Sequence, residues 1–584
     1  MKKIYLLIAL LSIICAAGCV GDILEITDDP ASSSDSGSSG DGQPDGSISE
    51  VDFNGEVTVT YSSDGASVSG TSDQFSVASD GGSVVITYTG SENILYILTG
   101  ESANGSFKLY SEARQAVRLS SLNLTNRDGA AINIQSGRLT YMEVTGSNSL
   151  SDSGSAQYPT DGEDCKGVLF SEGSLLFSGS GSLTVNCQNS AGKSGIVSDD
   201  HIAFSDSPSI TVTAGSAAGH GVKANDYVQI SGGNLDITAR AAMKKGITSD
   251  DYVLVEGGST TINISGGVAY DSEDAEYKGT AGIKADNYFK MTGGVVTITN
   301  SGTGGKGVRA GSETYSGTGK AGVISDSSIS GGTLTITTTG SESNDVSSKG
   351  IKIGWSVGSE NRVTANDGGI TISGGKVVVS SSKSEAFEVK DTFNMTGGEV
   401  YASSSADDAI NSTGNMNISG GYIYAFSSRN DALDANGNLT LSGGYVMAIS
   451  TAGGAEVAID CAEQKTLTIG SGVTMVAYPS LEQGASMKQT CYTMSCTAGS
   501  WNALHNGSSY IAAFKVPSGI SSVVVSAPSL KSGYKGVSVG SSTYCSGVWA
   551  TDGIGGGTST SLSEYSGGGG FGPGGGPGGG GHWH

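Results

Sequence analysis

The chain has 584 residues, of which 93 are glycine and only 15% are charged, and its formal net charge is -25. This charge disfavours nucleic acid as a partner, because nucleic-acid binding rewards clustered cations. The glycine content without a Gly-X-Y period excludes collagen and indicates a turn-rich β protein.

The first residues predict export. Lys2 and Lys3 precede an apolar run over residues 4–17, which is too short to span a bilayer but has the length of a signal-peptide core. Small residues then lead to Cys19, as in a lipoprotein cleavage box, so we expect residues 1–18 to be a signal peptide and Cys19 to carry lipid. The alternative is an ordinary secretory signal that contains a cysteine. We expect the protein in the cell envelope, anchored by lipid in the outer membrane, where it could face outward.

Composition divides the rest of the chain. Residues 19–50, rich in Ser, Gly and Asp, predict a flexible tether. Residues 51–115 predict an N-terminal β segment, residues 476–553 a C-terminal β cap, and the Gly-rich residues 554–584 a disordered tail. Six further cysteines permit disulfides in an oxidising compartment, with their connectivity left open.

Residues 116–475 contain a short repeat. A Gly-Gly turn precedes alternating apolar positions, and its second glycine recurs at Gly375, Gly398, Gly421 and Gly444, with longer intervals before Gly375 that indicate loop insertions. Period-2 alternation between turns predicts half-buried strands. Such units are too short for a propeller blade and predict an all-β fold, a parallel β-helix of roughly a dozen coils.

One phrase recurs within this repeat, at residues 221–227, 282–287, 408–411 and 431–438. Over roughly residues 55–475, the pattern resembles a bacterial carbohydrate-binding β-helix family first described from a cellulolytic clostridium. The resemblance implies a right-handed parallel β-helix, calcium bound along its surface, and affinity for plant polysaccharides such as polygalacturonate and cellulose. It also implies a fold similar to that of calcium-dependent pectate lyases, which keeps an enzymatic function open.

Stacking of the coils should place two positions of each unit in rows. The leading row is the residue before the small Gly or Ala of each unit: His220, Lys245, Ala281, Lys306, Lys349, Glu385, Asp408, Asp431 and Val457. The outward row is the residue two positions after that Gly or Ala: Lys223, Thr248, Lys284, Arg309, Lys352, Glu388, Asn411, Asp434 and Asp460. Both rows change from basic to acidic between Lys352 and Glu385.

The acidic part of the rows predicts a calcium site. Carboxylates one coil apart would lie about 5 Å from each other and repel by about 3 kcal/mol per pair, which a hard cation would remove. The candidate ligands are Asp408, Asn411, Asp431, Asp434 and Asp460, with Asp407 and Glu388 behind them. The alternative is a solvated acidic face whose repulsion is screened by salt.

The basic part of the rows predicts a site for an acidic polysaccharide, since a polyanion lying along the coils would meet a regular series of cations. The alternative is that these cations pair with nearby acids such as Asp226, Asp250 and Asp286. The candidate residues are Lys223, Lys245, Lys284, Lys306, Arg309, Lys349 and Lys352.

Tyr227, Tyr252 and Tyr288 each lie six residues after the small residue of their unit, and His201 has the same offset. They predict an aromatic ladder at one turn. Such a ladder could dock sugar rings or stabilise adjacent coils, and we favour stabilisation.

The sequence predicts binding without catalysis. Lys352 or Lys390, near the junction of the basic and acidic residues, could be the base of a calcium-dependent polysaccharide lyase. However, the chain has no P-loop or H-E-x-x-H motif. We therefore expect calcium-assisted binding of an acidic plant-type glycan, with a lyase and a structural or adhesive rod as alternatives.

Overall fold

The computed structural model describes residues 51–158, 162–311, 325–354, 368–454 and 456–567. These ranges contain strands and turns and no helix. Within them, accordingly, no helix has the length and apolar character needed to cross a membrane. Long parallel ladders dominate the strand pairing, which confirms the predicted all-β class.

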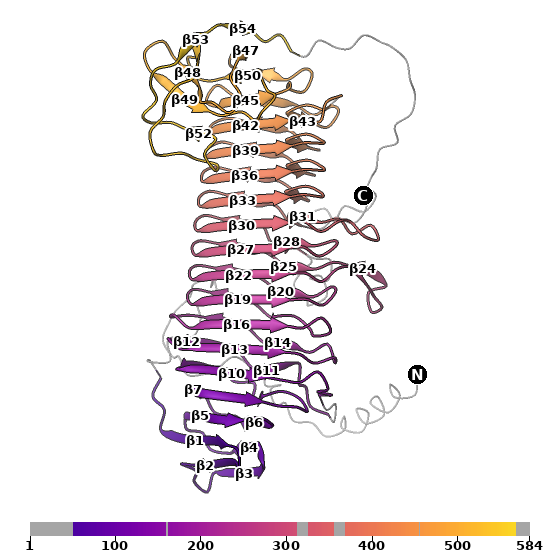
Figure 1. The fold of residues 1–584 in the computed structure, drawn as a ribbon, viewed down its shortest axis with the longest axis vertical. Coiled ribbons are helices and arrows are strands. Elements are labelled where there is room, and N and C mark those ends of the chain that lie inside the picture. Colours follow the sequence, from indigo (N-terminus) through magenta and orange to yellow (C-terminus); the bar gives the residue numbers. More distant parts are fainter. Residues whose placement is uncertain (1–50, 159–161, 312–324, 355–367, 455, 568–584) are drawn as a thin grey trace, which may run out of the picture. The chain divides into compact units, whose positions relative to one another are not determined.

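The repeat corresponds to three short strands per coil, each paired in parallel with its counterpart in the next coil. One coil consists of β17 (Val222–Ala224), β18 (Val228–Ile230) and β19 (Asn234–Ala239), and the next of β20 (Lys245–Ser249), β21 (Val253–Val255) and β22 (Ser259–Ile264). The two coils pair in register along all three strands. Figure 1 shows β19 and β22 stacked one above the other, and the ladder that contains β17 has 15 strands within the described residues.

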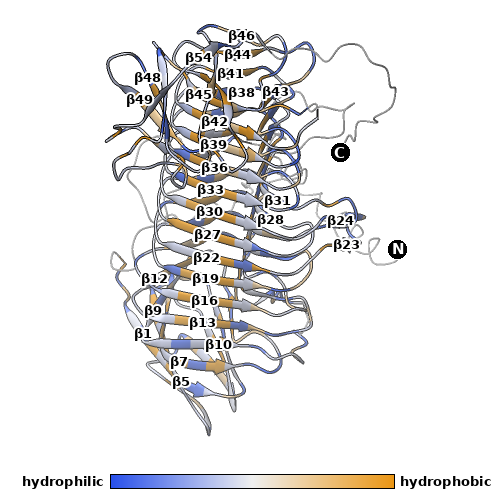
Figure 2. Cartoon of the chain, turned by 45° about the horizontal axis from the view of Figure 1, so that its top comes forward, coloured by the Kyte–Doolittle hydropathy of each residue, from blue (hydrophilic) through white to orange (hydrophobic). Residues whose placement is uncertain are grey.

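Alternating side chains explain why these segments form strands. In β19 the apolar Leu235 and Ile237 are buried, whereas Asn234 and Asp236, which alternate with them, are exposed. Figure 2 shows the same alternation of hydrophobic and hydrophilic residues along the stacked strands. The inward side chains of successive coils form one continuous buried core.

The Gly-Gly turns are required by the close stacking of the coils. Gly294 has a φ of 74°, and a Cβ at this position would lie 2.4 Å from the backbone oxygen of Gly257 in the preceding coil. A Cβ at Gly293 would lie 2.1 Å from the backbone oxygen of Glu256. Both positions therefore need glycine, for backbone conformation at one and for close approach at both.

Parallel stacking begins earlier in the chain than predicted. β1 (Gly55–Ser62) pairs in parallel with β5 (Ile94–Ser102), which pairs in parallel with β7 (Gln115–Thr125). The predicted boundary at residue 115 therefore has no counterpart in the strand pairing. The reason is that buried alternating residues continue through β1 and β5 although the Gly-Gly turns do not.

After β45 (Thr474–Tyr478), the chain adds one more short parallel pair, between β46 (Ser486–Met487) and β44 (Leu467–Ile469). The strands that follow β46 pair in the antiparallel direction, and one of them, β50 (Ser522–Ser526), pairs with β45. A five-stranded antiparallel sheet has the order β52 (Trp549–Ala550), β49 (Tyr510–Phe514), β48 (Asn502–His505), β51 (Ser532–Lys535) and β53 (Thr558–Thr560). Its inner side contributes Phe514 and Trp549 to a buried cluster shared with Tyr424 and Met447 of the stack.

The prediction that residues 554–584 form a disordered tail is wrong for its first part. β53 pairs with β51, and β54 (Leu562–Glu564) pairs with β47 (Tyr492–Ser495). The physical reason is local, since Thr558 and Thr560 suit a strand and Leu562 packs against the buried cluster of the antiparallel part. Residues 568–584 lie outside the described residues.

All six cysteines in the described ranges are free thiols, and five of them are buried. The disulfides that the sequence permits are therefore not formed in this structure. Cys19, the predicted site of lipidation, lies outside the described residues, as does the tether to residue 50.

Candidate functional site

The strand register places the outward row in one line across consecutive coils, as the sequence predicts. Lys284, Arg309 and Lys352 pair one after another on β25 (Ala281–Ala285), β28 (Lys306–Ala310) and β31 (Lys349–Ile353). The same line continues through the amide of Asn411 and three acids: Glu388, Asp434 and Asp460. These side chains are half-buried or buried at the surface of the stack because both neighbours of each residue in the strand point into the core.

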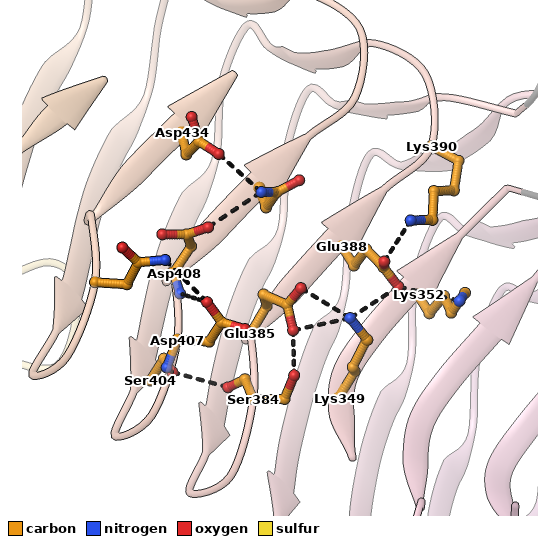
Figure 3. A network of polar contacts seen from close by, with 12 residues as sticks. Lys349, Lys352, Ser384, Glu385, Glu388, Lys390, Ser404, Asp407, Asp408 and Asp434 are labelled. Atoms are coloured by element: carbon orange, nitrogen blue, oxygen red, sulfur yellow. Dashed lines mark hydrogen bonds and ion pairs between the residues drawn. The ribbon is translucent and has the colours of Figure 1, made fainter. Parts of the chain in front are cut away.

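An ion-pair network occupies the junction of the basic and acidic residues (Figure 3). Lys349 Nζ lies 2.8 Å and 2.9 Å from the two carboxylate oxygens of Glu385 and 3.1 Å from Glu388 Oε2. Glu388 also contacts Lys352 at 3.2 Å and Lys390 at 2.5 Å. Lys349 is only 7% exposed and Glu388 only 5%, so these charges are neutralised by one another rather than by water.

The electrostatics of this junction follow from that pairing. Burial alone would lower the pKa of Lys349, but the carboxylates of Glu388 and Glu385 outweigh burial and raise it. Burial likewise opposes ionisation of Glu388, yet the three surrounding lysines hold its pKa well below the usual range. Glu388 is therefore better explained as the counter-ion of these lysines than as a calcium ligand.

The two lysines considered as lyase bases are both held by this network. Lys390 and Lys352 contact the carboxylate of Glu388. A general base has to be within reach of the substrate proton and free to accept it. The pairing with Glu388 gives neither lysine that freedom. The pKa of Lys352 is lowered by burial, although the carboxylate of Glu388 acts in the opposite direction.

The acidic residues beyond the junction lack such compensation. Asn411 Nδ2 donates to Asp408 Oδ2 at 3.1 Å and to Asp434 Oδ2 at 2.9 Å, so the amide lies between two carboxylates of neighbouring coils. Burial, together with Asp434 and Asp407, raises the pKa of Asp408 well above its usual value. Burial, with repulsion from Asp460, also raises the pKa of Asp431 to about 8 and that of Asp434 to about 6.

These acids fit calcium by their chemistry. In the described ranges no three His, Cys, Asp or Glu side chains converge in the manner of a preformed metal cluster. What the coils bring together is two carboxylates, Asp408 and Asp434, on either side of the Asn411 amide. Carboxylate and amide oxygens are donors that calcium takes, usually with backbone carbonyls and water to complete six to eight ligands. Asp407 Oδ1 likewise accepts hydrogen bonds, from the backbone N–H of Asp408 and from Asn430 Nδ2.

The basic candidates do not form one exposed stripe, contrary to the prediction. Lys306 and Lys349 of the leading row are each only 7% exposed. Lys306 Nζ donates to the backbone oxygen of Gly304 at 3.0 Å, and Lys245 Nζ donates to that of Met243. The sequence could not show this, because the leading position lies at the strand start, where the side chain folds over the turn.

The outward-row cations divide between the two interpretations that the sequence leaves open. Lys284 forms an ion pair with Asp286, as the pairing alternative expects. Lys223 and Arg309 have no ion-pair partner among the residues that the structure describes. These two side chains keep a charge available to a ligand.

The aromatic ladder is present. His201 and Tyr227 stack with ring centroids 4.5 Å apart, Tyr227 and Tyr252 at 4.8 Å, and Tyr252 and Tyr288 at 4.9 Å, all within 8° of parallel. Both faces of each inner ring, Tyr227 and Tyr252, are therefore covered by the neighbouring rings. A sugar ring docks on an aromatic face, so this geometry favours the stabilising role for Tyr227 and Tyr252.

Sequence reasoning missed a hairpin and the cavity beneath it. β23 (Ala269–Asp271) and β24 (Glu276–Lys278) form an antiparallel hairpin between β22 and β25 (Figure 1). A cavity of about 180 Å³ is lined by residues of this hairpin and by His220, Lys245 and Arg309 of the stack. The long interval between Gly258 and Gly294 signals an insertion, but no sequence pattern indicates where the insertion folds back.

Known proteins support the assignment that the repeat suggests. A family model described as carbohydrate-binding domain-containing protein matches residues 80–368 and 356–513. Among solved structures, a polysaccharide lyase-like protein from C. thermocellum, solved as a gadolinium derivative, is 24% identical, with a TM-score of 0.36 over 44% of this chain and 95% of that one. No curated protein matches the chain. The resemblance carried by the repeated phrases is confirmed by the family model, and because that model covers more than half of the chain, the protein belongs to the carbohydrate-binding domain-containing family.

Proposed function

We propose that this protein binds polysaccharide at the cell envelope without cleaving it, with the help of calcium, and that its ligands are acidic plant-type glycans such as polygalacturonate, with cellulose as a further ligand. The observation that carries this proposal is the outward row, in which cations and then acids follow one another on consecutive coils. Membership of a carbohydrate-binding family supports polysaccharide as the ligand class.

The outward-row cations provide the anion contacts. Lys223 and Arg309, and Lys284 beside Asp286, lie on a ladder whose coils are about 4.8 Å apart. An extended chain with a carboxylate on each sugar can meet several of them at once, and charge-assisted hydrogen bonds to guanidinium and ammonium groups are stronger than neutral ones.

Calcium, when bound, would be held by Asp408 and Asp434 with Asn411 between them, and it would neutralise these buried carboxylates. Asp431 lies in the same coil as Asp434, Asp460 lies in the next coil, and both add to the acidic surface. Without a cation, this surface would repel an acidic glycan. The acids therefore couple glycan binding to calcium.

Binding without cleavage is supported by the contacts of the lysines near the junction. The lyase alternative requires a free base close to the acidic residues, and both Lys352 and Lys390 are engaged by Glu388. The envelope location and the lipid on Cys19 are supported by the N-terminal sequence, and the lipid would be the protein's contact with the membrane.

Affinity electrophoresis tests this function. The chain without residues 1–19 is run through gels that contain polygalacturonate, with calcium or with a chelator, and we expect retardation with calcium alone. Combined Asp408→Asn and Asp434→Asn substitutions should remove the effect of calcium. Asp236→Asn, an exposed acid on β19, is the matched control and should leave it intact.

Other results would contradict separate parts of the proposal. Equal retardation by the calcium-stripped protein would rule out the role of calcium. If polygalacturonate and cellulose do not retard the protein and no glycan on a broad array binds it, the alternative of a structural or adhesive rod would be favoured. Unsaturated sugar ends accumulating in the polymer would show a lyase.

A further inference from the structure

The cavity beneath the hairpin β23–β24 carries an excess of positive charge. Its cationic lining residues are Lys244, Lys245, Lys278, Lys284 and Arg309, and His220 lies beside them. The acids on its wall, Asp271, Asp274 and Glu276, all belong to the hairpin and all contact one lysine, Lys278. The charged side chains that the stack contributes to the lining are therefore all cationic.

Three of these cations have no carboxylate partner among the described residues: Lys244, Lys245 and Arg309. The Nζ of Lys245 donates to the backbone oxygen of Met243, and the buried Nε of Arg309 has no hydrogen-bond partner. Lys349 in the same leading row shows how the fold neutralises a buried lysine, since Glu385 and Glu388 surround it. Lys245 forms no ion pair with a carboxylate of the residues that the structure describes.

The surroundings of Lys245 and His220 are unfavourable for charge without a ligand. Burial, together with Lys284 and Arg309, lowers the pKa of Lys245 well below its usual value, and burial with Lys245 does the same for His220. The His220 Nδ1 accepts a hydrogen bond from the backbone N–H of Lys245 at 3.0 Å, which leaves Nε2 as the donor of the neutral ring. An anion in the cavity would offset this positive charge and favour the protonated forms of Lys245 and His220.

We propose that this cavity binds the carboxylate-bearing ring of a single uronic acid residue, with Arg309 and Lys245 holding the carboxylate. A volume of about 180 Å³ suits one sugar ring and is too small for a length of chain. A guanidinium group matches a carboxylate in two parallel hydrogen bonds, which a neutral sugar cannot form. The inference deepens the proposed function, on which it rests, by adding a site for one residue of the acidic glycan.

The outer face of the hairpin supplies a control. Tyr270 and Tyr277 pair across its two strands, are 53% and 46% exposed, and have ring centroids 5.2 Å apart. Strand alternation puts both rings on the face opposite Asp271 and Glu276, which line the cavity. A ligand in the cavity should therefore not depend on either tyrosine.

The experiment measures binding of free galacturonate to the full chain by saturation-transfer NMR, with galactose as the neutral comparison. We expect galacturonate to bind and galactose not to bind. Arg309→Gln and Lys245→Met should each weaken galacturonate binding by roughly 10- to 100-fold, the effect of losing a hydrogen bond to a charged group. Lys531→Met, which removes an exposed cation elsewhere, and Tyr270→Ala should leave binding unchanged. A thermal melt of each variant confirms folding.

The outcomes separate this inference from the proposed function. Equal binding of galactose, unchanged binding by both cavity variants, or loss of binding in Tyr270→Ala would overturn the cavity site. Competition by acetate would support recognition of the carboxylate, whereas binding of inorganic phosphate without galacturonate would overturn a sugar site. If galacturonate binds through Arg309 but polygalacturonate gels do not retard the protein, the cavity site stands and polymer binding fails. If polygalacturonate gels retard the protein in a calcium-dependent way but free galacturonate does not bind, the proposed function stands and the cavity site fails.

Discussion

The behaviour of each charged side chain in this protein depends on the residue one coil away. Lys245 and Lys349 occupy the same row, the first half-buried and the second buried, yet Lys349 is surrounded by carboxylates and Lys245 by cations. The pKa values of the two amines consequently shift in opposite directions. Glu388 and Asp431 differ in the same way, because lysines surround the first and other acids lie near the second.

Asp431 predicts a specific dependence of stability on pH. Its pKa is raised from 3.8 to about 8, first by burial and then by Asp460. A carboxyl with a raised pKa in the folded state stabilises the fold when protonated, so its contribution is complete below its unfolded pKa and is lost as the pH rises through about 8. In chelator, we expect the melting temperature to fall between about pH 5 and about pH 9, and calcium to raise it more at the higher pH.

Calorimetry of Asp431→Asn checks this expectation. The substitution removes the titrating group and should flatten the fall in melting temperature, whereas Asp236→Asn should keep the wild-type slope. A slope that Asp431→Asn leaves unchanged would show that the general negative charge of the chain, and not this buried carboxyl, causes the fall.

Among the structural elements, the turns are the most tightly constrained. Gly293 and Gly294 bring one coil within contact of the preceding backbone, where no side chain fits. At the neighbouring turn, the rings from His201 to Tyr288 stack from coil to coil. Both features stabilise the stacking of one coil on the next, which is the repeating interface of the fold.

The ladder predicts a loss of stability without a loss of binding. Tyr252→Ala removes two ring contacts, at 4.8 Å and 4.9 Å, and should destabilise the fold by about 1–3 kcal/mol. Tyr252→Phe keeps both ring contacts and should reduce the free energy of unfolding far less than Tyr252→Ala does. Denaturant unfolding gives the stability, and retardation by polygalacturonate gives the binding. Weakened retardation by a Tyr252→Ala protein of normal stability would assign the ladder to sugar binding instead.

Across the whole molecule, the C-terminal antiparallel part packs on the side of the stack as well as closing it. Trp549 Nε1 donates to the backbone oxygen of Ile423 at 3.1 Å, and the backbone N–H of Cys545 donates to Glu399 at 2.7 Å. Tyr422 stacks on Tyr544 with ring centroids 3.7 Å apart. The aromatic residues Tyr422 and Tyr424 of the stack are thereby covered by protein.

Trp549 tests whether this packing stabilises the molecule. The indole is fully buried, so Trp549→Ala should reduce the free energy of unfolding by about 3–5 kcal/mol. Trp549→Phe fills part of the space but loses the hydrogen bond to Ile423. Its free energy of unfolding should therefore lie between those of the wild-type protein and Trp549→Ala. A melting temperature that is the same in all three proteins would show that the C-terminal part contributes little to the stability of the stack.

The repeat allowed the fold and much of the site to be predicted. In a stack of coils, residues one repeat apart in sequence become neighbours in space, so the sequence offset alone predicted the line from Lys284 to Asp460 and the tyrosine ladder. The same reasoning failed where the repeat is interrupted. It gave no position for the hairpin, and it mistook the strands β53 and β54 for part of a disordered tail.

The sequence by itself determined the class of fold, the register of the coils and the order of charges along them, because period-2 alternation and Gly-Gly turns admit one way of stacking. Only the tertiary structure decided which of those charges are available. Burial and pairing depend on distances between side chains from different coils, and these join Glu388 to three lysines while leaving Arg309 without a carboxylate among the described residues.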